Sequence, residues 1–210
     1  MTAEPRGDGG TAAPPPTGDR RPTKRDSIVE AAARLIRTEG VHAASMSVLI
    51  KESAASAGTI YHHFASKNDI VLAVARSAVV GPLESILAHQ PAGLRSPGDL
   101  LREIVGAVMA GDVESALIVQ LWAGSSREPL LKDILRDQMA EVHVGLTREV
   151  RRWLEANNAP GAAERAPHLS HVIMGQAMGL LAERTILTDL DRDAYLDEAA
   201  RLLDAAASVG

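Results

Sequence analysis

Residues 58–69 read GTIYHHFASKND and contain Tyr61 and Phe64, two of the five Trp, Tyr and Phe residues in a chain of 210. Aromatic side chains are large core anchors, so a helical protein with so few of them is expected to place them in its main core. Here they stand in one short segment, on either side of the adjacent histidines His62 and His63. This crowding indicates a small domain with a core of its own.

The segments before this stretch carry the signals of two helices. Residues 27–40, SIVEAAARLIRTEG, repeat apolar positions at helical spacing and end at Gly40, which is typical of a helix C-terminus. Residues 45–54, SMSVLIKESA, begin with Ser45, a candidate N-cap. A third short helix then starts after a very short turn and includes the first part of the quoted stretch.

The end of the quoted stretch begins a longer fourth helix. Ser66 is a candidate N-cap, Asp69 favours the first turn, and the apolar run continues to Leu87. Three short helices with a tight turn between the second and third are the layout of a helix-turn-helix, in which the third helix enters the major groove of DNA.

Residues 25–76 resemble the DNA-binding domain of the TetR family of transcriptional regulators. That family shows an alanine-rich first helix ending in Gly, followed by I-A-x-x-A-G-V-S-x-G-T-[IL]-Y-x-H-F-x-[SN]-K-x-x-[IL]. The matching positions are Gly40, Ser56, Gly58, Thr59, Ile60, Tyr61, His63, Phe64, Ser66, Lys67 and Ile70. Ala54 replaces the glycine of the turn and Ile50 replaces a small alanine at the helix crossing, so we expect a slightly altered turn or crossing angle.

The side chains of this domain predict several DNA contacts. Phe64 is expected to plug the three-helix core. Tyr61 and Lys67 are expected to bind phosphates, Tyr61 through its hydroxyl and Lys67 beside the free N–H groups at the start of the fourth helix. Ser56 and Thr59 either touch DNA or only cap the third helix. His62 is expected to reach DNA, and His63 to pack or to bond a phosphate.

Adjacent histidines on a helix point too far apart to chelate one metal ion easily, so His62 and His63 do not predict a metal site. Further candidates for DNA binding lie at the edges of the domain. Arg20, Arg21, Lys24 and Arg25 precede the expected first helix and form either an arm along the phosphates or minor groove, or a solvated run of charge. The complete set of predicted DNA-binding residues is Tyr61, Lys67, Thr59, His62, His63, Ser56, Ser45, Gly58, Arg21, Lys24 and Arg25.

The charge of the chain is divided along its length. The net charge is −5, yet residues 20–76 carry nine basic and five acidic groups, while residues 77–210 carry twelve and nineteen. A basic segment joined to an acidic remainder is what a small polyanion-binding module on a larger body shows. No cysteine is present, and the first residues carry no apolar run of a signal peptide. We therefore expect a cytoplasmic protein that does not cross a membrane.

The whole chain is predicted to be all-α, with about nine helices and no strand pattern. We expect a disordered Pro- and Gly-rich tail over residues 1–22, a helix-turn-helix domain over 23–70, and a ligand-binding and dimerisation domain over 71–210. The five helices after the fourth are expected near 97–110, 112–124, 129–157, 164–187 and 192–207. Pro167 is easiest to accommodate if regular helix starts only there.

The resemblance implies that the last two helices pair with their copies in a homodimer, which reads a near-palindromic double-stranded operator and releases it when a small-molecule effector binds. Small residues such as Gly175 and Gly179 fit one such face. Side chains that are polar or adaptable among aliphatic stripes are effector candidates, although a methionine at helical spacing is also ordinary core. They are Met109, Gln120, Trp122, Met139, His143, Met174 and Met178.

Other classes of function have fewer residues to support them. The sequence lacks the H-E-x-x-H, G-x-S-x-G, phosphate-loop and paired E-x-x-H motifs, so we expect no enzyme and no cofactor. His168 and His171 near Glu164 are a weak metal alternative without an evident fourth ligand. The competing interpretation is an all-α adaptor that binds only protein. Salt-sensitive retention on DNA distinguishes the two.

Overall fold

The computed structural model describes residues 23–88, 93–110 and 115–209, and every regular element within these ranges is helical. The all-α prediction is therefore confirmed. The elements are α1 (Lys24–Glu39), η1 (Val41–Ala43), α2 (Met46–Glu52), α3 (Ala57–His63), α4 (Lys67–Ala75), η2 (Arg76–Val80), α5 (Gly81–Ala88), α6 (Pro97–Ala110), α7 (Ser115–Ser125), α8 (Pro129–Ala156), α9 (Ala162–Glu183) and α10 (Arg192–Ser208). The predicted tail over residues 1–22 lies outside the described part of the chain.

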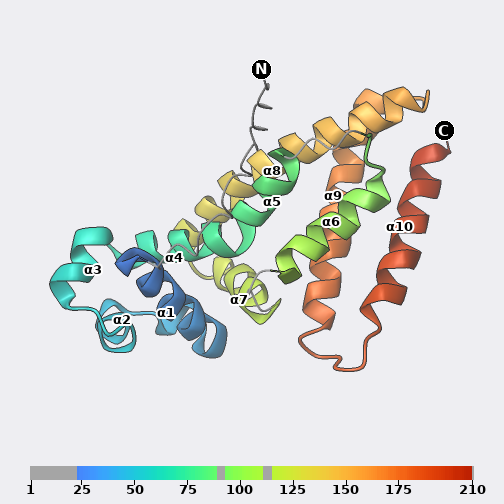
Figure 1. Cartoon of the computed structure of the whole chain (residues 1–210). Coiled ribbons are helices and arrows are strands. Elements are labelled where there is room, and N and C mark those ends of the chain that lie inside the picture. The colour runs from blue at the N-terminus through green and yellow to red at the C-terminus, as the bar shows by residue number, and fades with distance from the viewer. Residues whose placement is uncertain (1–22, 89–92, 111–114, 210) are drawn as a thin grey trace, which may run out of the picture.

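The first three helices form a small unit at one end of the molecule, which we call the head (α1, η1, α2 and α3; Figure 1). Ile28, Leu49, Ile60 and Phe64 are buried in it. Phe64 is thus a core residue, as predicted. The expected stop at Gly40 is also confirmed, because Gly40 has a φ of 83° and its N–H donates to the Ile36 carbonyl.

A continuous rod, α4–η2–α5, leads from the head into the body (α6 to α10) and crosses the predicted domain boundary at residue 70. By length and composition alone this rod, Lys67–Ala88, is apolar enough to cross a membrane. In the fold 56% of its apolar window is buried, because α4 packs on α1 and α8 and α5 packs on α6 and α8. The apolar run is therefore accounted for as a core helix.

The middle of the rod is a π-helical segment, η2, which helical periodicity did not reveal. The N–H of Gly81 donates to the carbonyl of Arg76, five residues back. Pro82 follows and has no N–H, so the regular ladder cannot continue to the Ala78 carbonyl. If the rod is counted as one helix, the described residues contain nine separate α-helices in addition to the short 3-10 turn η1.

Helix α8 carries the predicted apolar stripe along one side. Leu131, Leu135, Val142, Leu146 and Val150 are buried, and the remaining two members of the stripe are half-buried. This face packs mainly on α9, while α10 packs on α6 and α9 (Figure 1). The long helix is thus buried along one side, as expected.

The expectation for Pro167 was wrong, because α9 begins at Ala162 and contains Pro167 within it. A proline inside a helix removes the hydrogen bond to the carbonyl four residues earlier, here that of Ala163. Nη2 of Arg151, on α8, donates to this carbonyl at 3.4 Å. A donor from the neighbouring helix therefore replaces the missing N–H.

Candidate nucleic-acid interface

Side-chain caps position the two helices of the helix-turn-helix. Oγ of Ser45 accepts the N–H of Val48 at 3.4 Å, and Oγ of Ser56 accepts the N–H of Thr59 at 3.1 Å. The hydroxyls of Ser56 and Thr59 lie 2.8 Å apart. Of the two alternatives left open for Ser56 and Thr59, the structure shows capping of α3; both predicted DNA contacts stay predictions.

The turn between α2 and α3 retains a glycine-like backbone. Ala54 has a φ of 51°, in the left-handed region that glycine adopts readily and alanine does not. The other departure, Ile50, is half-buried and packs against the core. Because alanine stands where the family pattern has glycine, the left-handed backbone at Ala54 is locally strained.

Helix α3 divides cleanly into a buried and an exposed face. Ile60 is fully buried, whereas Tyr61 exposes 56% of its surface and His62 and His63 are also exposed. Gly58, one turn earlier, is exposed as well, and a Cβ added there would meet nothing closer than 3.9 Å. The predicted DNA-facing residues of α3 therefore share an accessible surface, with small residues at its start where a DNA backbone can approach.

The predicted arm before α1 is partly wrong. Lys24 and Arg25 lie inside the first turn of α1, behind a capping box between Thr23 and Asp26. The guanidinium carbon of Arg25 lies 5.1 Å from the centroid of the Phe64 ring, a cation–π contact that holds it on the head. Both side chains remain exposed. Arg21 lies outside the described residues.

Lys67 occupies the first position of α4, as predicted. Ser66 and Asp69 form a reciprocal capping box, so the start of the helix is firmly defined. Nζ of Lys67 lies 3.8 Å from Oε1 of Glu128, and Nδ1 of His42 lies 3.2 Å from the same oxygen. Nothing in the sequence EPLL, which begins at Glu128, indicates a partner in the head, so this contact was not predictable from the sequence.

The seven effector candidates are scattered through the body. Met174 is buried, while Met109, Met139 and Met178 are half-buried against the core. Trp122 exposes 42% of its surface, and the Gln120 side chain approaches Gly40 at the head. Four surface hollows of about 270 to 710 Å³ are lined by described residues, and none of the seven lines any of these four. The effector site stays a prediction.

His143 is the effector candidate with a defined polar partner. Its Nδ1 lies 2.9 Å from Oγ of the buried Ser170, and its ring centroid lies 4.0 Å from that of His171. Burial, followed by the charge of His171, lowers the pKa of His143. A second buried polar contact is made by α8: Nη2 of Arg95 lies 3.0 Å from Oε2 of Glu149.

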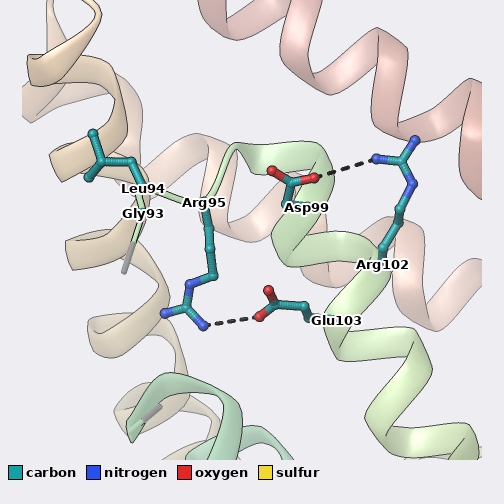
Figure 2. A pocket seen from close by; sticks show the side chains of 6 residues that line it. All are labelled: Gly93, Leu94, Arg95, Asp99, Arg102 and Glu103. Carbon is teal, nitrogen blue, oxygen red and sulfur yellow. Dashed lines mark hydrogen bonds and ion pairs between the residues drawn. The ribbon is translucent and has the colours of Figure 1, made fainter. Parts of the chain in front are cut away.

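A hollow of about 270 Å³ lies beside this Arg95 contact, between residues 93–95 and α6 (Figure 2). Figure 2 shows Arg95 reaching toward Glu103, and Asp99 facing Arg102. Nη1 of Arg95 lies 3.0 Å from Oε2 of Glu103. Burial acts to raise the pKa of Glu149, but the contact with Arg95 and the charges of Arg95, Arg152 and Arg148 together outweigh burial, so the pKa of Glu149 is lowered. Each charge thus has an opposite neighbour, which is typical of a structural anchor.

The described residues contain no group of three or more His, Cys, Asp or Glu side chains placed to hold a metal ion. The weak alternative around Glu164 therefore has no geometry in its favour.

Comparisons with known proteins agree with this architecture. Residues 28–74 match the family model described as bacterial regulatory proteins, tetR family. The HTH-type transcriptional regulator UidR of Escherichia coli (strain K12) is 27% identical over 193 residues, which cover 88% of this chain and 92% of UidR. The HTH-type transcriptional regulator BetI of Yersinia pestis (strain Pestoides F) is 27% identical over 149 residues, which cover 69% of this chain and 75% of BetI.

Solved structures share the whole fold. Salmonella enterica GusR superposes with a TM-score of 0.71 at 24% identity, covering 87% of this chain and 94% of GusR. A putative transcriptional regulator from Saccharomonospora viridis, in complex with choline, superposes with a TM-score of 0.57 at 22% identity, covering 86% of this chain and 93% of that one. At these identities the structures support the fold alone.

Proposed function

By residues 28–74 we infer that the chain, a member of the tetR family of bacterial regulatory proteins, is a cytoplasmic repressor of transcription. Its curated relatives are DNA-binding regulators and not enzymes. We propose that a homodimer binds a near-palindromic operator and is released by a small hydrophobic effector.

The exposed face of α3 carries this proposal. Tyr61, His62 and His63 project from a helix whose opposite side is locked into the head by Ile60 and Phe64. A helix held in this way enters the major groove as a rigid body. Lys67, at the start of α4, and the hydroxyl of Tyr61 flank it as phosphate contacts that fix the register.

An apolar face on α9 and α10 supports the dimer. Val172 exposes 46% and Leu202 exposes 63% of its surface, and both line a mainly apolar hollow of about 400 Å³. The other lining residues are Leu169, Gln176, Tyr195, Glu198, Ala199, Leu203 and Ala206. In a dimer with a two-fold axis, each copy covers this apolar face of the other copy. The two-fold symmetry of the dimer then matches that of a palindromic DNA site.

The effector is assigned to the body because α8 and α9 carry Met139, Met174 and Met178, which adapt to varied apolar shapes. A ligand that binds one arrangement of α8 better than another shifts the population toward that arrangement. Release from DNA follows if that arrangement separates the two heads.

Three experiments test the proposal. Protection mapping near the protein's own gene should reveal one near-palindromic footprint, and retention on random duplex DNA should fall steeply with added salt. An absence of retention at low salt would instead favour an adaptor that binds only protein. For the effector, thermal shifts across hydrophobic metabolites and choline should find a stabiliser that also weakens operator binding, since the two equilibria are linked.

A further inference from the structure

One carboxylate of the body reaches across to the head. Glu128 stands immediately before α8, and its Oε1 lies 3.2 Å from Nδ1 of His42 and 3.8 Å from Nζ of Lys67. The Lys67 and Glu128 side chains are 26% and 31% exposed, so this ion pair is only partly solvated. His42 takes part as an ion only when it is protonated.

Close packing around Glu128 explains how it reaches the head. A Cβ added at Gly124 would lie 2.9 Å from Cγ2 of Val41, so the end of α7 touches η1 directly. The N–H of Glu128 donates to the carbonyl of Gly124 at 3.1 Å, which ties Glu128 to this contact. Although it precedes α8, its side chain makes no capping hydrogen bond. The carboxylate is therefore directed to the head without a role in capping α8.

This position conflicts with the proposed role of Lys67. A phosphate oxygen bound by Lys67 would bring a second negative charge close to the Glu128 carboxylate. Like charges at such a separation repel, and the repulsion is stronger where the pair is partly removed from water. The ammonium group thus has two competing anionic partners, one in the body and one on DNA.

We propose that Glu128 competes with the DNA backbone for Lys67, so that the body restrains DNA binding through this contact. This inference rests on the proposed DNA-binding function. Met139 and His143 lie on the same continuous helix, α8, whose start is next to Glu128. Any shift of α8 relative to the head changes how firmly Lys67 is held, and therefore changes DNA affinity.

The test uses a random-sequence duplex at low salt, because phosphate contacts do not depend on sequence. Binding is measured for wild type, Glu128→Gln, Lys67→Gln and the double variant. Glu128→Gln should tighten binding by about 2- to 10-fold, the range expected for one or two partly exposed ion pairs in a dimer. In the Lys67→Gln background the same change should have little effect.

Two further variants separate competition from general charge. Glu141→Gln removes an exposed carboxylate from α8 and should leave DNA affinity nearly unchanged. Glu128→Asp retains the charge on a shorter side chain, so it should tighten binding in the same direction as Glu128→Gln. Thermal melting confirms that each variant is folded.

The competition is overturned if Glu128→Gln weakens binding or leaves it unchanged in folded protein. It is equally overturned if the gain persists without Lys67, because the carboxylate would then act only through net charge. If wild type and all variants fail to bind DNA even at low salt, the proposed function itself fails. That outcome is distinct, since it does not depend on either residue.

Discussion

His143 and Ser170 connect two long helices through a single polar contact, 2.9 Å between Nδ1 and Oγ. Ser170 is fully buried on α9, and the half-buried imidazole reaches it from α8. Either atom can donate, depending on the tautomer of the ring. Because a buried hydroxyl without a partner costs free energy, this contact helps to fix how α8 lies on α9.

The free energy of unfolding should decrease as the pH falls below about 6.5. The pKa of His143 is lowered from 6.5 in the folded state by burial and by His171. The unfolded chain therefore binds more protons in this range, and protonation favours unfolding. Urea unfolding of wild type at pH 7.5 and pH 5.5 should show the loss. His143→Gln retains a polar partner for Ser170 and should reduce the pH dependence.

The matched control for this experiment is His168→Gln, an exposed histidine on α9, the helix that carries Ser170. If His143→Gln unfolds with the same pH dependence as wild type, the linkage to His143 is incorrect.

Ala54→Gly should stabilise the protein by about 1 kcal/mol. A left-handed alanine costs roughly 1–2 kcal/mol, and the greater conformational entropy of glycine in the unfolded chain offsets part of the gain from removing that cost. Thermal or urea unfolding measures the change. The control is Ala57→Gly in the first turn of α3, where glycine should destabilise by about 0.5–1 kcal/mol. A loss of stability in Ala54→Gly would show that the turn is not strained.

Lys67→Ala should weaken binding to the operator and to random DNA by similar factors, because a phosphate contact carries no sequence information. With two copies on the duplex, the slope of log affinity against log salt should decrease by roughly 2. Tyr61→Phe should weaken operator binding with little change in slope, since a hydroxyl releases no counterion. Salt titrations with both duplexes provide the measurement, and an unchanged slope in folded Lys67→Ala would remove Lys67 from the interface.

Val172→Glu or Leu202→Glu should convert the dimer to monomers. Each dimer would bury two carboxylates without partners, which costs several kcal/mol, on the order of a hundredfold or more in the dissociation constant. Analytical ultracentrifugation measures the association, and Leu130→Glu, an exposed position at the start of α8, is the control. Gly179→Glu is less informative, because a Cβ there lies 3.9 Å from the Tyr195 hydroxyl of the same chain. A clean dimer in both variants would place the interface elsewhere.

Features that depend on residues a few positions apart were determined by the sequence itself. Ser45 and Ser66 cap the helices that they were expected to cap, Ser56 caps α3, which was one of two alternatives left open for it, and Gly40 ends α1. Helical periodicity likewise placed the long helices of the body near their observed bounds. In each case the partners are joined by a short length of backbone, so their geometry follows from local preferences.

Only the tertiary structure decided what distant residues do to one another. Pro167 lies inside α9, where Arg151 on α8 supplies a donor to the Ala163 carbonyl. Lys67 was recognisable as a phosphate-binding candidate, but its proximity to Glu128 required α7 to dock on the head. Long-range pairing of this kind depends on the packing of whole helices, so it cannot be read from the pattern of residues along any one helix.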